Sequence, residues 1–230
     1  MATGVCCSPV EMITLALEAS TYTGTVAVIR DGAVVAERET AMRGVHEERL
    51  MPAVADVLAA ADVAPNAIDR VVCGEGPGSF TSLRIAGAIA KGLALSANAP
   101  LYPVSSLLLI VAGSQPSPAP GRYVAVLDAM RGDVFASVFS VTDAAITGES
   151  RTTILPRGAL TEFARERAAR PIGPAETSIA IPHARGVAKL GAAVPWPDAA
   201  DLATWEPNYG RLAEAQVKWE AAHGRALTAG

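Results

Sequence analysis

Short apolar runs separated by turn residues open the chain. Residues 13–18 form one apolar run, and residues 25–30 (TVAVIR) form a second that is rich in β-branched side chains. The dipeptide Asp31-Gly32 follows, a strong signal for a two-residue β-hairpin turn. Residues 33–40 then continue as the returning strand. This pattern predicts an antiparallel meander at the start of the fold.

The apolar spacing changes to a helical period between residues 47 and 62. Large apolar residues recur there at intervals of one, three and four: Leu50, Met51, Val54 and Leu58. This spacing is typical of one face of an amphipathic helix. Pro52 lacks the N–H that a helix interior uses, so the regular helix either begins near it or bends there.

A strand, a glycine turn and a second helix come next. Residues 69–74 (DRVVCG) read as a buried strand, and Ser79 is a good N-cap for a helix over residues 80–96. Residues 101–104 predict another strand, followed by a short apolar helix. Strands that alternate with helices after an opening meander indicate a mixed sheet in an α/β layer structure.

The Pro/Ser/Gly-rich stretch 114–121 (SQPSPAPG) is the best linker candidate in the chain. Strands are expected on either side of Arg131, and the pattern weakens beyond residue 143. We therefore expect a flexible N-terminal tail over residues 1–12, a first subdomain over 13–113, and a smaller second subdomain over 114–230.

Composition limits the possible partners. The chain has 230 residues, of which half are hydrophobic, and 19 basic residues are outnumbered by 23 acidic ones. Because the basic residues do not cluster, the chain is not expected to hold RNA alone. No apolar run is long enough for a membrane helix, so no membrane contact is expected. The three cysteines form no disulfide framework, which favours a reducing, cytoplasmic setting with Cys73 as a buried thiol.

The glycine turn Gly74-Glu75-Gly76-Pro77-Gly78 precedes the second helix and allows two interpretations. Free N–H groups at a helix start can bind anions, but Glu75 adds negative charge and no lysine follows as in a P-loop. We favour a tight structural turn. A weaker hypothesis is a nucleotide site formed by this turn and the end of the first strand, with these residues: Glu18, Ser20, Thr21, Gly76 and Gly78.

The helix over residues 80–96 is rich in small residues, which lowers its intrinsic stability unless a close neighbour compensates. That neighbour is either the protein's own sheet or a partner. The three histidines lack metal-ligand spacing, and no catalytic triad stands out, so we expect neither a metal site nor catalytic residues. Arg131 is expected to be structural, paired with Asp128 or Asp133.

Five stretches, in order, resemble the TsaB (YeaZ) family: ITLALEAST, GEGPGSFTSLRIAGAIAKGLA, YPVSSL, VLDAMRGDVFASVF and EPNYGRLAEAQVKW. GPGSFTSLRI is the most specific of them. The family usually has glycine where this chain has Ser82, and often aspartate where it has Glu18. The resemblance implies an actin-like ATPase (sugar kinase and Hsp70-like) fold, with two related α/β subdomains, mixed sheets and a reduced second half.

The resemblance also implies a role without catalysis. Such a chain pairs with and activates TsaD, the catalytic subunit that makes threonylcarbamoyladenosine (t6A) in tRNA, in a complex with TsaE. TsaD-like chains carry two metal-binding histidines that correspond here to Ser106 and Ile110, and isoleucine cannot bind a metal. We expect no tightly bound cofactor, although ATP or ADP can bind at the complex interface, and tRNA is reached only through the complex.

The two helices over residues 47–62 and 80–96 are the expected contact surface with TsaD, and with a second copy when TsaD is missing. The candidate contacts are Leu50, Met51, Val54, Leu58, Thr81, Arg84, Ile85, Ala88 and Ile89. An independent ATP-binding, kinase-like enzyme of the same fold is the alternative function. A glycoprotease, a label that the family has carried, is disfavoured because no nucleophile–base set is visible.

Overall fold

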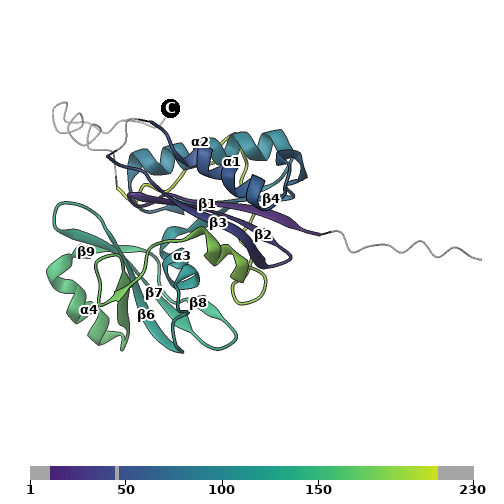
Figure 1. Cartoon of the computed structure of the whole chain (residues 1–230). Helices are drawn as coiled ribbons and strands as arrows, with labels where there is room; N and C mark the ends of the chain where they lie inside the picture. The colour runs from purple at the N-terminus through teal and green to yellow at the C-terminus, as the bar shows by residue number, and fades with distance from the viewer. Residues whose placement is uncertain (1–10, 45–46, 212–230) are drawn as a thin grey trace, which may run out of the picture.

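The computed structural model describes residues 11–44 and 47–211. The expected N-terminal tail lies outside the described residues except for its last two positions. The described chain forms two α/β halves, each built on one mixed sheet (Figure 1). The expected α/β class, with two halves built on mixed sheets, is thus confirmed. No helix in these ranges is long and apolar enough to cross a membrane.

The first half contains a five-stranded sheet in the order β3-β2-β1-β4-β5. Its strands are β1 (Ile13–Glu18), β2 (Thr23–Arg30), β3 (Ala33–Ala41), β4 (Arg70–Gly76) and β5 (Leu101–Ser105). β2 runs antiparallel to β1 and β3, whereas β4 runs parallel to β1 and β5. The opening meander is confirmed, and its β2–β3 turn places Asp31 and Gly32 at φ 51° and 80°, the left-handed pair that a tight hairpin requires.

Two helices cover one face of this sheet (Figure 1). They are α1 (Leu50–Ala60) and α2 (Phe80–Ala97). α1 begins three residues later than expected, which places Pro52 in the first turn, where a missing N–H costs no helical bond. The buried sides of both helices join one apolar cluster with β1, β2 and β4.

The second half repeats the strand arrangement of the first. Its elements are β6 (Gly121–Asp128), β7 (Asp133–Val141), β8 (Ile146–Gly148), β9 (Thr153–Pro156), α4 (Leu160–Glu166), β10 (Arg170–Gly173) and β11 (Ser178–Ile179). The sheet order is β11-β10-β6-β7-β8, with β9 also paired to β7. β6 is antiparallel to β7 and parallel to β10, as β1 is to β2 and β4. The matched order supports the expectation of two related subdomains.

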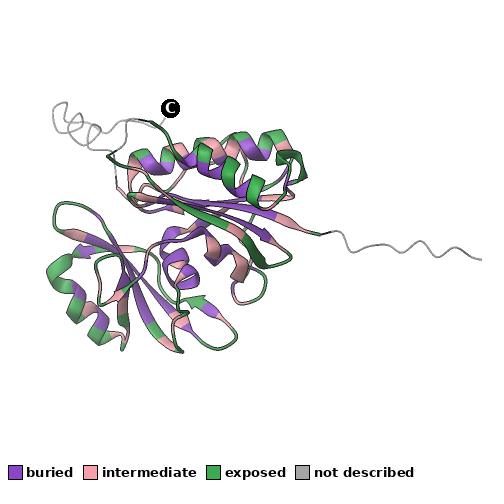
Figure 2. Ribbon diagram, in the orientation of Figure 1, coloured by how far each residue is buried: buried purple, intermediate pink, exposed green. Residues whose placement is uncertain are grey.

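A shared core joins the halves. It contains α3 (Ser106–Gly113) and the 3-10 helix η3 (Ala184–Lys189), and residues of both sheets belong to the same apolar cluster. Figure 2 shows α3 as a largely buried element between the two sheets. The linker predicted over residues 114–121 follows α3 directly and leads into β6.

The chain then returns from the second half to the first, and we call residues 200–211 the strap. The amide of Ala200 donates to the carbonyl of Leu101 at 2.7 Å, and the amide of Asn208 donates to the carbonyl of Glu75 at 2.6 Å. The expected division after residue 113 assigned the strap to the second subdomain. The structure instead packs residues 200–208 on the first half, whereas Arg211 at the end of the strap pairs with Asp133 of β7.

Candidate functional site

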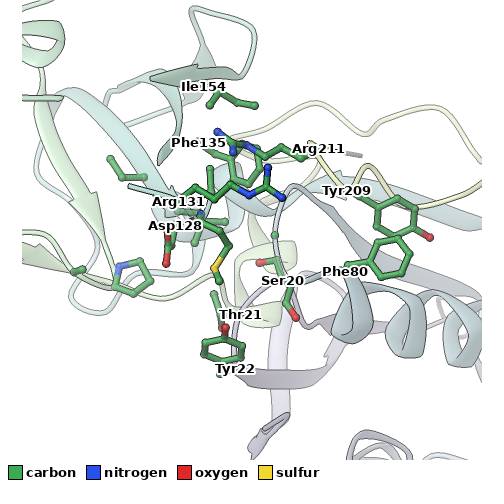
Figure 3. A pocket seen from close by; sticks show the side chains of 18 of the residues that line it. Ser20, Thr21, Tyr22, Phe80, Asp128, Arg131, Phe135, Ile154, Tyr209 and Arg211 are labelled. Carbon is green, nitrogen blue, oxygen red and sulfur yellow. Dashed lines mark hydrogen bonds between the residues drawn. The ribbon is translucent and has the colours of Figure 1, made fainter. Parts of the chain in front are cut away.

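A cleft of about 960 Å³ opens between the two halves (Figure 3). One wall consists of residues 20–22 after β1 and residues 78–81 at the start of α2. The other consists of residues 128–131 after β6 and residues 174–176 after β10. Because both walls follow the carboxyl ends of equivalent strands, the cleft has the position at which open α/β sheets bind ligands.

Glu18 ends β1 but is turned into the protein rather than the cleft. Its side chain is 1 % exposed. One carboxylate oxygen accepts a hydrogen bond from the Ser106 hydroxyl at 2.7 Å, and the other accepts from the Ser20 amide. Desolvation by burial raises the pKa of Glu18. Glu18 therefore offers no exposed oxygen to a ligand in the cleft, which corrects its assignment to the nucleotide site.

The glycine turn before α2 is filled by the protein's own chain. At Gly76, with φ 100°, a β-carbon would lie 2.2 Å from the Asn208 carbonyl oxygen. At Gly78, a β-carbon would lie 2.2 Å from the Ser20 carbonyl oxygen. The structural interpretation of this turn is therefore favoured. Of the five candidate nucleotide residues, Ser20, Thr21 and Gly78 line the cleft, whereas Glu18 and Gly76 do not.

The turn between β6 and β7 brings an arginine into the cleft. Three successive residues, Met130, Arg131 and Gly132, have φ values of 63°, 58° and 82°. A left-handed backbone costs a residue with a side chain roughly 1–2 kcal/mol. The hairpin is held by the Met130 amide, which donates to Asp128 Oδ1 at 2.8 Å. Figure 3 shows the Arg131 side chain extending from this turn toward Ser20.

The expected partners of Arg131 are both engaged elsewhere. Asp128 caps its own turn, and Asp133 forms an ion pair with Arg211. The remaining arginine of the cleft, Arg157, pairs with Glu176 at 3.0 Å. Within residues 11–44 and 47–211, Arg131 forms no ion pair or hydrogen bond through its side chain. The expected pairing of Arg131 is thus wrong, and its guanidinium has no ion-pair partner in the part of the chain that the structure describes.

The candidate contacts with TsaD on α1 and α2 fall into two groups according to their burial. Leu50, Val54 and Leu58 are buried in the apolar cluster under α1 and cannot reach a partner. This corrects their assignment: the apolar stripe that predicted the helix is the side that packs on the sheet. The remaining candidates reach the surface or its margin, and they are Met51, Thr81, Arg84, Ile85, Ala88 and Ile89, of which Thr81 also lines the cleft.

The strap occupies another side of α2. A β-carbon on Gly87 would lie 3.1 Å from Pro207 and 3.6 Å from Trp205, so this glycine serves an internal contact. The rings of Phe80 and Tyr209 lie 4.5 Å apart. Sequence reasoning missed these contacts because the strap has neither helical nor strand periodicity. Its concentration of tryptophan, proline and tyrosine was the available signal.

Ser106 and Ile110, which the family resemblance matched to metal ligands, are both buried here. The Ser106 hydroxyl donates to Glu18 and accepts from the Gly76 amide, while Ile110 lies in the shared core. His183 is buried against Arg185, which together with desolvation lowers the pKa of the imidazole to about 4. The described residues contain no group of three or more His, Cys, Asp and Glu side chains arranged to hold a metal ion.

Comparison with known proteins gives one consistent result. The family model for TsaD, tRNA N6-adenosine threonylcarbamoyltransferase, matches residues 36–180. The chain is 30 % identical over 226 residues to the tRNA threonylcarbamoyladenosine biosynthesis protein TsaB of Bacillus subtilis, covering 90 % of this chain and 98 % of that one. It is 37 % identical over 121 residues to TsaB of Escherichia coli, which is 53 % of this chain and 52 % of that one.

Solved structures agree. A Pseudomonas aeruginosa protein described as similar to peptidase YEAZ superposes with a TM-score of 0.72 at 25 % identity, covering 87 % of this chain and 100 % of that one. A structure of YeaZ from the same species has a TM-score of 0.68 at 24 % identity, covering 86 % and 99 %.

Proposed function

The chain belongs to the TsaB (YeaZ) family, and on this basis we propose that it acts in t6A biosynthesis as a non-catalytic subunit that pairs with TsaD and activates it. The observation that carries the proposal is an exposed face of α1 and α2 that presents small and apolar residues. Ala88 is exposed, and a β-carbon on Gly92 would meet nothing within 4 Å. Met51 and Leu95 are also exposed, at 43 % and 67 %.

Such a face suits a helical partner. Small residues allow another backbone to approach closely, and the exposed apolar side chains lose contact with water on association. Arg84 adds a fixed cation at the margin, since its Nε donates to the Tyr209 hydroxyl at 3.3 Å. We assign this face to TsaD, and to a second copy of the chain when TsaD is absent.

The proposal extends to tRNA, TsaE and nucleotide. A net charge of -4 without basic clusters supports contact with tRNA through the complex rather than directly. TsaE completes the assembly in this proposal, and a role on tRNA implies a cytoplasmic location. We propose that the isolated chain holds no nucleotide tightly and that ATP or ADP binds at the complex interface. The filling of the glycine turn by Asn208 and Ser20 supports this assignment.

An independent kinase-like enzyme remains the alternative. It requires a catalytic acid and open phosphate loops, whereas Glu18 is buried and Gly76 is covered by the strap. A peptidase would need an activated nucleophile. Burial raises the pKa of the Cys73 thiol, and His183 is enclosed beside Arg185, so neither side chain is suited to that role.

The test is gel filtration of this chain with TsaD of the same organism, combined with an assay of tRNA modification. Complex formation, and modification only when both are present, are the expected results. Ala88→Asp should abolish the complex while leaving the fold intact, and Ala144→Asp, on an exposed turn of the second half, is the matched control. Unchanged association of the Ala88→Asp variant contradicts the interface, and ATP turnover by the chain alone supports the kinase alternative.

A further inference from the structure

We infer that the cleft between the halves binds a small organic anion, in which one carboxylate or phosphate group is carried on an apolar, aromatic body. Arg131, Ser20 and the start of α2 would hold the anionic group. This inference does not rest on the pairing with TsaD, because described residues of a single chain line the cleft, and Thr81 is the only candidate TsaD contact among them.

The first observation is the unpaired cation. Arg157 and Arg211, the other arginines of the cleft, have carboxylate partners, and Asp128 is engaged by the Met130 amide. No described carboxylate forms an ion pair with Arg131 within 4.0 Å, although Asp128 also lines the cleft. Its backbone lies at φ 58° in the β6–β7 hairpin turn, where tight hairpins commonly use positive φ. A planar guanidinium presented in this way is suited to paired hydrogen bonds with a carboxylate or phosphate.

The second observation comes from the opposite wall. The Ser20 side chain lines the cleft and is 3 % exposed, and its hydroxyl oxygen has no hydrogen bond of ordinary geometry among the described residues, although it lies near enough to the buried Glu18 carboxylate to oppose the burial-driven rise of that group's pKa. Buried polar atoms without partners are rare in folded proteins, so this one calls for a ligand or water. Figure 3 shows Ser20 on the side of the cleft that Arg131 faces.

The start of α2 adds a favourable electrostatic field beside Ser20. The helix has 18 residues, its first turn contains no acidic residue, and no side chain caps its free amides. Gly78, Ser79 and Thr81 all line the cleft. Amides at a helix start favour negative charge. The cation from one half and the amides from the other therefore converge on the same space.

The other residues that line the cleft indicate the chemistry of the rest of the ligand. The cleft is bordered by apolar and aromatic side chains: Phe80, Phe135, Met130, Ile154, Tyr22 and Tyr209. Aromatic rings pack favourably against one another, and a low-dielectric wall strengthens the attraction between Arg131 and an anion. A phosphate chain fits poorly, because Asn208 and Ser20 fill the glycine turn that such a chain would use. A single anionic group is the better match.

The inference is tested with two probes, benzoate and phenyl phosphate, added to the isolated full-length chain and followed by amide NMR. Saturable shifts are expected at Thr81 and Met130 with at least one probe, and the stronger binder identifies the carboxylate or the phosphate as the preferred group. Benzyl alcohol keeps the ring without the charge and should bind at least tenfold more weakly than the probes. The probes should also bind the Arg131→Gln variant at least tenfold more weakly than the unmodified chain, given the usual strength of charged hydrogen bonds.

Arg165→Gln is the matched control, because Arg165 lies on α4, is exposed, and does not line the cleft. It should bind the probes as the unmodified chain does. Unchanged thermal unfolding of Arg131→Gln would exclude misfolding as the cause of lost binding. Failure of both probes to bind the unmodified chain, or equal binding by Arg131→Gln, would overturn the inference without affecting the proposed pairing with TsaD.

Discussion

Gly74 and Glu18 lie so close together that a β-carbon on residue 74 would be 1.7 Å from the Glu18 carboxylate oxygen. The missing side chain of one residue thus makes room for the buried acid of the other. Through Glu18, the end of β1 is connected to Ser106 at the start of α3. This contact joins the first sheet to the core that both halves share.

Gly74→Ala should destabilise the protein by about 2 kcal/mol or more, because overpacking displaces a buried, hydrogen-bonded carboxylate. Urea unfolding followed by circular dichroism measures the change. The double variant Gly74→Ala with Glu18→Ala removes the clash and should cost less than the sum of the two single variants. Strict additivity would show that the two side chains do not interact as described.

The variant Val54→Ala tests whether Val54 contributes to packing within the protein or to association with TsaD. Val54 is fully buried under α1, so its truncation should lower the free energy of unfolding by about 1–3 kcal/mol. The folded variant should still bind TsaD with unchanged affinity in a titration well below its unfolding temperature. Met51→Asp, at an exposed position of the same helix, should show the reverse pattern. If the fully folded Val54→Ala variant bound TsaD with lower affinity, Val54 would belong to the interface after all.

Substitutions at two glycines of α2 should change the stability of the protein in opposite directions. Gly92 faces open space, so Gly92→Ala should raise the stability of the isolated chain by up to about 1 kcal/mol. Gly87 lies under Pro207, and Gly87→Val should displace the strap and lower stability by about 1–3 kcal/mol. Thermal unfolding of the two variants compares them directly. A stabilised Gly87→Val variant would mean that the strap does not pack on α2.

His183 should make stability depend on pH. Its Nδ1 accepts from the Arg185 amide at 3.1 Å, and Glu39 lies 3.5 Å from Nε2. The pKa falls from 6.5 to about 4 on folding. The unfolded chain therefore binds the proton first as pH falls. The contribution is complete above pH 6.5 and is lost as the pH falls toward 4, by at most about 3 kcal/mol.

Urea unfolding between pH 7 and pH 4 measures this dependence. His183→Asn supplies an uncharged acceptor near Nδ1 and is the control, since its stability should change less over the same range. Equal slopes for the two proteins would assign the pH dependence to other groups.

Local signals in the sequence were sufficient for most of the first half. The Asp31-Gly32 turn, the helical spacing over residues 47–62 and Ser79 before α2 each place an element correctly, because each reflects backbone preferences of neighbouring residues. Beyond residue 143 the strands are only two to four residues long. Strands of that length carry too few alternating positions to give a clear pattern.

The site was predicted less well, for two physical reasons. Periodicity finds the apolar side of a helix but cannot say that a sheet rather than a partner covers it, and this misplaced Leu50, Val54 and Leu58. The unpaired state of Arg131 depends on Arg211, which is 78 residues from Asp133 along the chain. Contacts of such separation leave no local signature. The weak hypothesis for Ser20, Thr21 and Gly78 did locate one wall of the cleft.

The return of the strap to α2 also has a consequence for biosynthesis. During translation, the first sheet and its two helices are complete long before residues 200–211 leave the ribosome. Until then, Gly87 and the ring of Phe80 lack the residues of the strap that contact them in the complete structure. A chain that stops before the strap would therefore lack the contacts that Pro207, Trp205 and Tyr209 make with α2.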